Sequence, residues 1–155
     1  MLKSIEGNFD NVDVHELLVK HFIELRSVSP KGSAHVLDIS GLKDPSIKFW
    51  SLWKDDKLMG GGALKFLNNQ SGEFKSIRVN DKFRNNGYGL KVVNHLIEEA
   101  KKLGIKRLSL ETGAGTFFAP ARKLFIKSGF KVCDPFSHYK KDINSVYMSM
   151  LISND

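Results

Sequence analysis

The sequence predicts one α/β domain over residues 1–155, built on a mixed sheet, and three observations lead to this fold class. The 155 residues are 41% hydrophobic and 26% charged, which suits a globular domain rather than a disordered chain. One N-terminal helix is followed by a three-stranded antiparallel meander. Strands and helices then alternate, as in crossover connections between parallel strands. An antiparallel half that continues into a β-α-β half gives a mixed sheet, not a doubly wound parallel one.

The first element is a helix, expected over Val12–Leu25, where apolar residues recur at helical spacing. Asp10 or Asn11 can cap its start, because both side chains accept hydrogen bonds from backbone N–H groups. Residues 31–46 are expected to be irregular, with room for a short turn of helix around Ala34–Leu37.

Three strands joined by short turns come next, and they form the meander. The expected strands are Ile47–Trp53, Leu58–Leu67 and Glu73–Val79. The run Gly60–Gly62 lies inside the second strand, where it indicates a bulge or a close approach of another backbone.

The second half alternates between helices and strands. Helices are expected over Gly89–Leu103 and Phe118–Ser128, and strands over Arg107–Thr112, Phe130–Cys133 and Ser145–Ile152. Gly104 and Gly129 stand just past the two helices, in the position where a left-handed glycine commonly ends a helix.

Composition excludes several classes of protein. No apolar run approaches the ~20 residues of a membrane span. The first eight residues have no apolar core and include an acid, so we expect no secretion signal. Cys133 is the single cysteine, and the five histidines are scattered rather than clustered as zinc ligands. We therefore expect a cytoplasmic protein with no metal and no membrane partner.

The net charge of +7 is confined to the second half of the chain. Residues 1–72 carry 9 basic and 9 acidic side chains, whereas residues 73–155 carry 15 basic and 8 acidic ones, a difference of 15 − 8 = +7. Such an excess favours an anionic partner. A nucleic-acid-binding module is one interpretation, but the aromatic residues do not follow the basic ones, so we expect no nucleic acid partner.

A glycine-rich loop between a strand and a helix carries the clearest chemical signal. Its sequence is Arg84-x-x-Gly87-x-Gly89. Glycines let backbone N–H groups approach a ligand, and the first N–H groups of a helix have no partner within it. The loop therefore predicts a cradle for phosphate groups.

This loop and the residues after it resemble the GNAT superfamily of N-acetyltransferases. The matching segments are Arg84–Gly89, Leu108–Thr112 and Ala119–Phe130. A closer resemblance is to a bacterial branch of small uncharacterised acetyltransferases, through Ser29–Asp38, Leu110–Gly113 and Pro135–Ser145. The resemblance implies a central mixed sheet that splays open at a cleft for acetyl-CoA.

The resemblance also implies the residues that contact the donor. The backbone of one splayed strand would pair with the pantetheine, the glycine-rich loop would hold the pyrophosphate, and a later helix would flank the thioester. The residues implied are Ile77, Arg78, Val79, Arg84, Asn85, Asn86, Gly87, Tyr88, Gly89, Leu90, Phe118, Ala121, Leu124 and Phe125.

The implied reaction is direct attack of an amine on the thioester, which requires a base to take the amine proton. Glu73 is the first candidate for this base and Glu111 is the second. The family often has a tyrosine at Phe125 that protonates the thiolate. Tyr139, Tyr88 or water would replace it here.

The acceptor is expected to be a small amine rather than a protein. His35 and Asp38, in the irregular segment, are the candidate acceptor residues. A homodimer is compatible with this prediction. A CoA-binding protein without catalysis is an alternative, because the hydroxyl group at Phe125 is missing.

Overall fold

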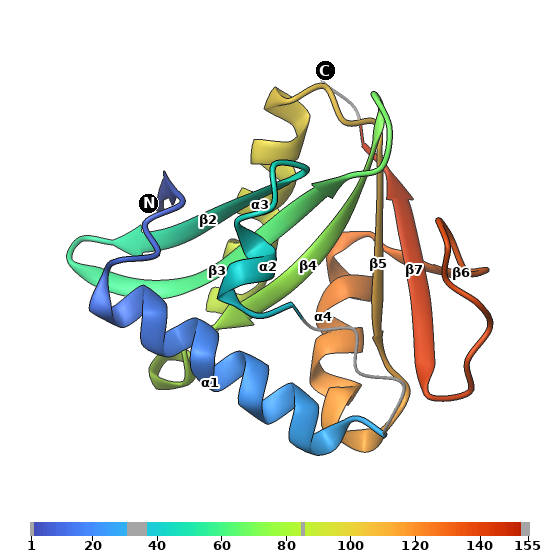
Figure 1. The fold of residues 1–155 in the computed structure, drawn as a ribbon, viewed down its shortest axis with the longest axis horizontal. Coiled ribbons are helices and arrows are strands. Elements are labelled where there is room, and N and C mark those ends of the chain that lie inside the picture. Colours follow the sequence, from blue (N-terminus) through green and yellow to red (C-terminus); the bar gives the residue numbers. More distant parts are fainter. Residues whose placement is uncertain (1, 31–36, 85, 153–155) are drawn as a thin grey trace.

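A computed structural model of the chain describes residues 2–30, 37–84 and 86–152. This part forms a seven-stranded mixed sheet and four α-helices (Figure 1). The strand order is β1-β2-β3-β4-β5-β7-β6, and only the β4–β5 pair is parallel. In chain order the elements are β1 (Lys3–Glu6), α1 (Val12–Val28), α2 (Ile39–Leu42), β2 (Ile47–Lys54), β3 (Lys57–Phe66), β4 (Ser71–Val79), η1 (Asp81–Phe83), α3 (Tyr88–Lys102), β5 (Arg107–Gly113), η2 (Thr116–Phe118), α4 (Ala119–Ser128), β6 (Lys131–Cys133) and β7 (Ser145–Leu151).

The predicted order of helices and strands is confirmed, with three differences near the N-terminus. Strand β1, an exposed strand that pairs with the outer edge of β2, was not predicted. Helix α1 extends three residues beyond Leu25, and Asn11 is its cap, since its side chain accepts from the N–H groups of Asp13 and Val14. A short helix, α2, lies in the segment expected to be irregular. Of the turn expected at Ala34–Leu37, residues 34–36 lie outside the described residues.

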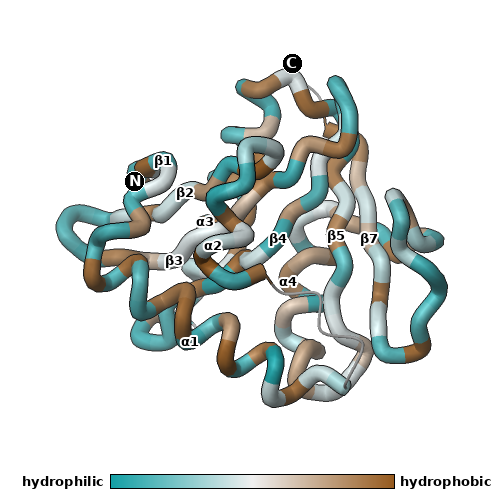
Figure 2. Tube along the Cα trace, viewed as in Figure 1, coloured by the Kyte–Doolittle hydropathy of each residue, from teal (hydrophilic) through white to brown (hydrophobic). Residues whose placement is uncertain are grey.

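Two pairs of helices cover the two faces of the sheet (Figure 1). Helices α1 and α2 pack on the front face in this view, over an apolar cluster centred on Val14, Leu42 and Ala63. Helices α3 and α4 pack on the other face, over a larger cluster that includes Leu96 and Leu108. Hydrophilic segments lie at the β2–β3 turn and in the loop before β7 (Figure 2). No helix of the described part is long and apolar enough to cross a membrane.

The three glycines of β3 allow the close contacts that the sequence predicted. A Cβ atom on Gly60 would lie 2.4 Å from the carbonyl oxygen of Arg78, and one on Gly62 would lie 2.5 Å from Leu96. Opposite Gly62, β4 has two residues, Ser76 and Ile77, because the pairing passes from Gly61–Arg78 to Ala63–Lys75. This β-bulge has Ser76 in a left-handed conformation, with φ of 54°.

The sheet opens in its middle, between β4 and β5. The parallel pairing runs from Ser71–Arg107 to Phe74–Leu110 and then ends. Both strands continue beyond that point, β4 to Val79 and β5 to Gly113. The splayed sheet that the resemblance implied is therefore present, and the bulge at Ser76 lies just past the point where the strands separate.

Candidate active site

A cavity of about 300 Å³ lies where β4 and β5 separate. Its walls come from the C-terminal part of α1, from β4 and β5, and from the segment around η2. The residues that line it are His21, Leu25, Val28, Ser29, Pro30, Glu73, Phe74, Lys75, Ser76, Glu111, Thr112, Gly113, Gly115, Thr116, Phe117, Phe118 and Asn144. It therefore brings together both predicted candidate bases, Glu73 and Glu111, with one predicted donor contact, Phe118.

Glu73 is held by two partners in the wall of this cavity. It is only 2% exposed, and its Oε2 atom accepts a 2.6 Å hydrogen bond from the hydroxyl group of Tyr139. Lys75 lies two residues further along β4, on the same face, and its Nζ atom is 3.3 Å from the same oxygen and 3.1 Å from the Tyr139 hydroxyl. The three side chains form a closed triangle that fixes the carboxylate.

The pKa of Tyr139 is raised well above its usual value. Burial is the main cause, followed by the hydrogen bond to Glu73 and the negative charges of Glu73 and Glu111. The hydroxyl group therefore stays protonated and acts as a donor. This suits a residue that orients Glu73 better than one that gives up a proton.

Glu111 faces the same side of the sheet from β5. Its Oε2 atom accepts a 2.8 Å hydrogen bond from the hydroxyl group of Ser145 on β7. Its neighbours on both sides in β5, Leu110 and Thr112, are buried, whereas Glu111 is half-buried. Glu111 is thus a second carboxylate within reach of a ligand in the cavity.

The glycine-rich loop, which the sequence predicted to be a phosphate cradle, leads into the start of α3. Gly87 has φ of 80°, the left-handed conformation that glycine adopts without strain. No described side chain caps this end of α3, and its first turn contains no acidic residue. The first N–H groups of the helix are therefore available to an anion. Asn85 lies outside the described residues.

Other residues predicted at the cradle have partners of their own. Nε of Arg84 is 3.0 Å from Oδ1 of Asp81. The hydroxyl group of Tyr88 lies 3.1 Å from Nζ of Lys54, and this hydrogen bond is the main cause that lowers the pKa of Tyr88. Lys91 also lies over the Tyr88 ring. Tyr88 thus lies at the start of α3 with two lysines, away from the triangle around Glu73.

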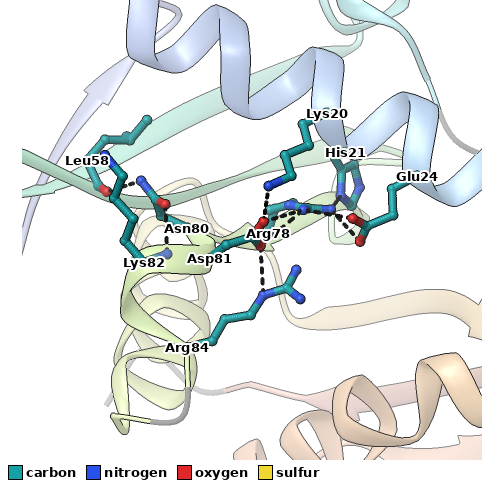
Figure 3. A network of polar contacts seen from close by, with 9 residues as sticks. All are labelled: Lys20, His21, Glu24, Leu58, Arg78, Asn80, Asp81, Lys82 and Arg84. Atoms are coloured by element: carbon teal, nitrogen blue, oxygen red, sulfur yellow. Dashed lines mark hydrogen bonds and ion pairs between the residues drawn. The ribbon is translucent and has the colours of Figure 1, made fainter.

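The side chain of Arg78, a predicted donor contact, does not point toward the donor site. Its side chain is 3% exposed and points to α1, where it meets Glu24 at 3.1 Å, while Asp81 lies 3.1 Å away on the other side (Figure 3). Nη1 also lies 3.5 Å from Nδ1 of His21. The guanidinium group is therefore engaged within the protein, and the backbone of Arg78 pairs with Gly61 of β3 rather than facing the open edge of β4.

Helix α4 and the segment before it form the last wall. Leu124 packs against the start of α3, since a Cβ atom on Gly89 would lie 3.1 Å from it. Phe125 is 7% exposed and packs edge-to-face on Phe130 in the core, with Ala121 also against that core. Phe118 covers Gly113, where an added Cβ would lie 2.1 Å from the ring.

Of the two predicted acceptor residues, Asp38 does not line the described cavity. His35 lies outside the described residues. Asp38 is exposed and caps α2, since its Oδ1 atom accepts a 2.8 Å hydrogen bond from the N–H group of Gly41. This is a local structural role.

Several residues that line the cavity were not predicted as site residues, among them His21, Lys75 and Ser76. His21 lies on the buried face of α1 with Val14 and Leu18, and the sequence carried no signal for a role of this residue. The position of Ser76 depends on the bulge, which the sequence indicated only through the glycines of the partner strand. Within the described residues, no group of three or more His, Cys, Asp or Glu side chains could hold a metal ion.

Comparison with known proteins identifies the family. The model of the acetyltransferase (GNAT) family matches residues 11–130. The chain belongs to this family. YsnE of Bacillus subtilis strain 168, described as an uncharacterized N-acetyltransferase, is 45% identical over 136 residues, which cover 88% of this chain and 90% of YsnE. YedL of Escherichia coli K12, with the same description, is 35% identical over 139 residues, which cover 90% of this chain and 87% of YedL.

Solved structures establish that the fold is the GNAT acyl-CoA N-acyltransferase fold. A putative acyl-CoA N-acyltransferase from Klebsiella pneumoniae matches with a TM-score of 0.77 at 20% identity, over 97% of both chains. A Bacillus subtilis acetyltransferase in complex with CoA matches with a TM-score of 0.72 at 22% identity, over 99% of this chain and 100% of that one. The protein is thus an N-acetyltransferase of the GNAT family.

Proposed function

We propose that this single-domain GNAT protein transfers the acetyl group of acetyl-CoA to the primary amine of a small molecule. The observation that carries the proposal is the end of β4–β5 pairing at Phe74 and Leu110. Beyond it, one edge of β4 is left for a ligand, and a cavity with Glu73 and Glu111 in its walls opens beside that edge.

The chain offers two sets of backbone groups to the donor. Peptide groups of Ile77 and Val79, past the last β4–β5 pair, are available to the pantetheine amides in the manner of an added strand. The uncapped N–H groups at the start of α3 would bind the pyrophosphate. Leu124 and Ala121 supply apolar contacts from α4.

Glu73 serves as the base in this proposal. An amine attacks a thioester only when it is neutral, so its proton must pass to a base, directly or through water. Both hydrogen bonds described for Glu73 fall on Oε2. Lys75 and Tyr139 therefore fix the carboxylate through one oxygen, and Oε1 is the atom assigned to the proton. Glu111 attracts the ammonium form of the acceptor to the same cavity.

The thiolate takes its proton from water in this proposal. Phe125 has no hydroxyl group and is buried in the core. The Tyr88 hydroxyl is at the start of α3 beside Lys54, and the Tyr139 hydroxyl is committed to Glu73. Water is sufficient because a thiolate is a much better leaving group than an amine anion.

The size of the cavity supports a small acceptor. A volume of about 300 Å³ is at the lower end of the range of small-molecule pockets, and a protein substrate would reach it only through one extended side chain. The end of α1 and the two residues after it, from Leu25 to Pro30, form one wall of this cavity.

The test is to incubate the protein with acetyl-CoA and a panel of amines and to follow free thiol. Thiol release that depends on the amine supports the proposal. Tight CoA binding without turnover across the panel, protein acceptors included, would overturn it in favour of a CoA-binding protein without catalysis. Binding to DNA with no affinity for CoA would overturn it in favour of a nucleic-acid-binding module.

A further inference from the structure

His21 is a buried polar residue that neither the fold nor the proposed chemistry uses. It lies on α1, is 6% exposed and lines the cavity. Its Nδ1 atom faces Nη1 of Arg78 at 3.5 Å (Figure 3). A guanidinium group only donates hydrogen bonds, so Nδ1 must be the acceptor and the ring proton must be on Nε2.

The neighbours of Arg78 keep His21 in this form. Nη1 and Nη2 of Arg78 lie 3.1 Å and 3.4 Å from the two carboxylate oxygens of Glu24, and Asp81 holds Nη2 at 3.1 Å. The cation is thus fixed beside the imidazole ring. Burial and the charges of Arg78 and Arg84 lower the pKa of His21 to about 3, so the ring is neutral at physiological pH.

The donor on His21 has nothing to bind. Among the described residues, only three buried side-chain polar atoms lack a hydrogen-bond partner: Nε2 of His21, Oγ of Ser76 and Nε2 of His95. His21 and Ser76 both line the cavity, whereas His95 lies on α3 and does not. An unpaired buried polar group costs about 1–3 kcal/mol, so two of them among the residues that line one cavity indicate that a ligand completes them.

The chemistry of the two groups selects the ligand atom. The Nε2–H group of His21 is a donor, and the Ser76 hydroxyl group can donate as well. A carbonyl or carboxylate oxygen has two lone pairs and can accept from both. The carboxylates of Glu73 and Glu111 line the same cavity and would attract an ammonium group instead. The cavity therefore has separate features for a cation and for an oxygen acceptor.

We propose that His21 and Ser76 form a subsite for a carbonyl or carboxylate oxygen of the acceptor, so that the enzyme prefers amines that carry such an oxygen over plain alkylamines. This inference rests on the proposed function. Arg78 is a positioning residue in it, because it acts on the ligand only through the tautomer of His21.

The experiment compares chain-length-matched primary amines that end in a methyl, a carboxamide or a carboxylate group. The measured quantity is kcat/KM for each amine with saturating acetyl-CoA. For the wild-type protein we expect the best oxygen-bearing amine to exceed its alkyl counterpart by roughly 10–100-fold, the effect of one or two hydrogen bonds. Comparison of carboxamide with carboxylate identifies the form of the oxygen.

Three variants test the residues. His21→Leu and Ser76→Ala should each reduce the ratio of oxygen-bearing to alkyl amine by roughly tenfold, and His21→Gln should retain part of it because its amide can donate. A variant that only disturbs folding would lower both rates and leave the ratio unchanged. His95→Leu is the matched control, since it removes a buried imidazole outside the cavity, and its ratio should equal that of wild type.

Two results would overturn the subsite. One is a wild-type protein that turns over alkyl and oxygen-bearing amines equally well, and the other is a set of variants with the wild-type ratio. Both differ from failure of the proposed function, in which no amine releases thiol at all.

Discussion

The hydroxyl group of Tyr139 lies 2.6 Å from Oε2 of Glu73, although 66 positions separate the two residues. Tyr139 comes from the loop between β6 and β7, whereas Glu73 is on β4, next to the point where the sheet opens. Lys75 contacts both partners. The candidate base is thus positioned by a residue from the far edge of the domain.

Glu73→Gln should lower kcat by roughly 10²–10⁴-fold while CoA affinity stays unchanged, because the amide cannot take a proton from the amine. The substitution keeps the shape of the side chain and an oxygen that can accept from Tyr139. Steady-state kinetics and CoA titration by calorimetry measure the two quantities. Near-normal turnover would transfer the role of base to Glu111 or to water.

Tyr139→Phe separates positioning from chemistry. We expect a smaller loss of kcat than for Glu73→Gln, because Lys75 still holds the carboxylate at 3.3 Å. A loss as large as that of Glu73→Gln would instead mean that the Tyr139 hydroxyl takes part in proton transfer. Ser145→Ala is the control, because it removes the hydrogen bond to Glu111 instead of the one to Glu73. If Glu73 is the base, this variant should keep a kcat close to that of wild type.

The sequence predicted the order of the elements because that order depends on local signals. Helical spacing gave α1 and α3, and turn residues gave the meander. Strand β1 was missed because three of its four residues are exposed and it shows no apolar alternation. Helix α2 has four residues, too few for any periodicity to appear.

The polar residues of the site were harder to place, for a physical reason. Side chains of a strand alternate between faces, so Glu73 and Arg78, five apart, would lie on opposite faces of a regular β4. The bulge at Ser76 adds one residue and resets the alternation. Arg78 therefore turns to α1 together with Glu73 and Lys75, and it does not join the cradle.

The uneven distribution of charge along the sequence does not divide the site into a donor half and an acceptor half. The excess of basic residues after position 72 suggested that the second half serves the donor. Lys75 and Arg78 belong to that half, yet they pair with Glu73 and Glu24 on the α1 face. Conversely, Lys54 from the neutral first half binds Tyr88 at the start of α3. Tertiary packing mixes the two halves at both parts of the site.

The contact between Phe118 and Gly113 gives a prediction for stability. Gly113→Ala should lower the free energy of unfolding by about 1–3 kcal/mol, because the new Cβ atom would lie 2.1 Å from the Phe118 ring and must displace it. Gly115→Ala is the matched control, since nothing lies within 4 Å of its added Cβ atom. Urea denaturation measures both. Equal stability of the two variants would contradict this packing.

The start of α3 gives a prediction for donor binding. Lys91 is exposed in the second turn of this helix, over the Tyr88 ring, so Lys91→Glu puts a negative charge near the proposed pyrophosphate site. The KM for acetyl-CoA should rise roughly 3- to 10-fold, and the increase should shrink at high salt. Lys131→Glu makes the same charge change on the exposed strand β6 and should change KM by less than about twofold. Equal effects of the two substitutions would show that net charge, not the start of α3, attracts the donor.

The neutral state of His21 gives a prediction for the dependence of stability on pH. Its folded-state pKa of about 3 is below the value of 6.5 for an unfolded histidine, so below pH 6.5 the unfolded chain binds a proton that the folded protein does not. Stability should therefore fall as the pH drops from 6.5 towards 3. At a pH of about 4.5, two units below 6.5, the loss from His21 amounts to about 3 kcal/mol.

His21→Gln should remove this loss, because glutamine does not titrate while the other groups, including Glu24, Arg78 and Arg84 around the ring, remain. The measurement is the free energy of unfolding of wild type and variant, each at neutral pH and at a pH of about 4.5. Wild type should lose about 3 kcal/mol more than His21→Gln over this interval, since the charges that lower the pKa of His21 are fixed by the contacts of Arg78. Equal losses would mean that His21 takes up a proton in the folded protein, and Nδ1 could then not be the acceptor that faces Arg78.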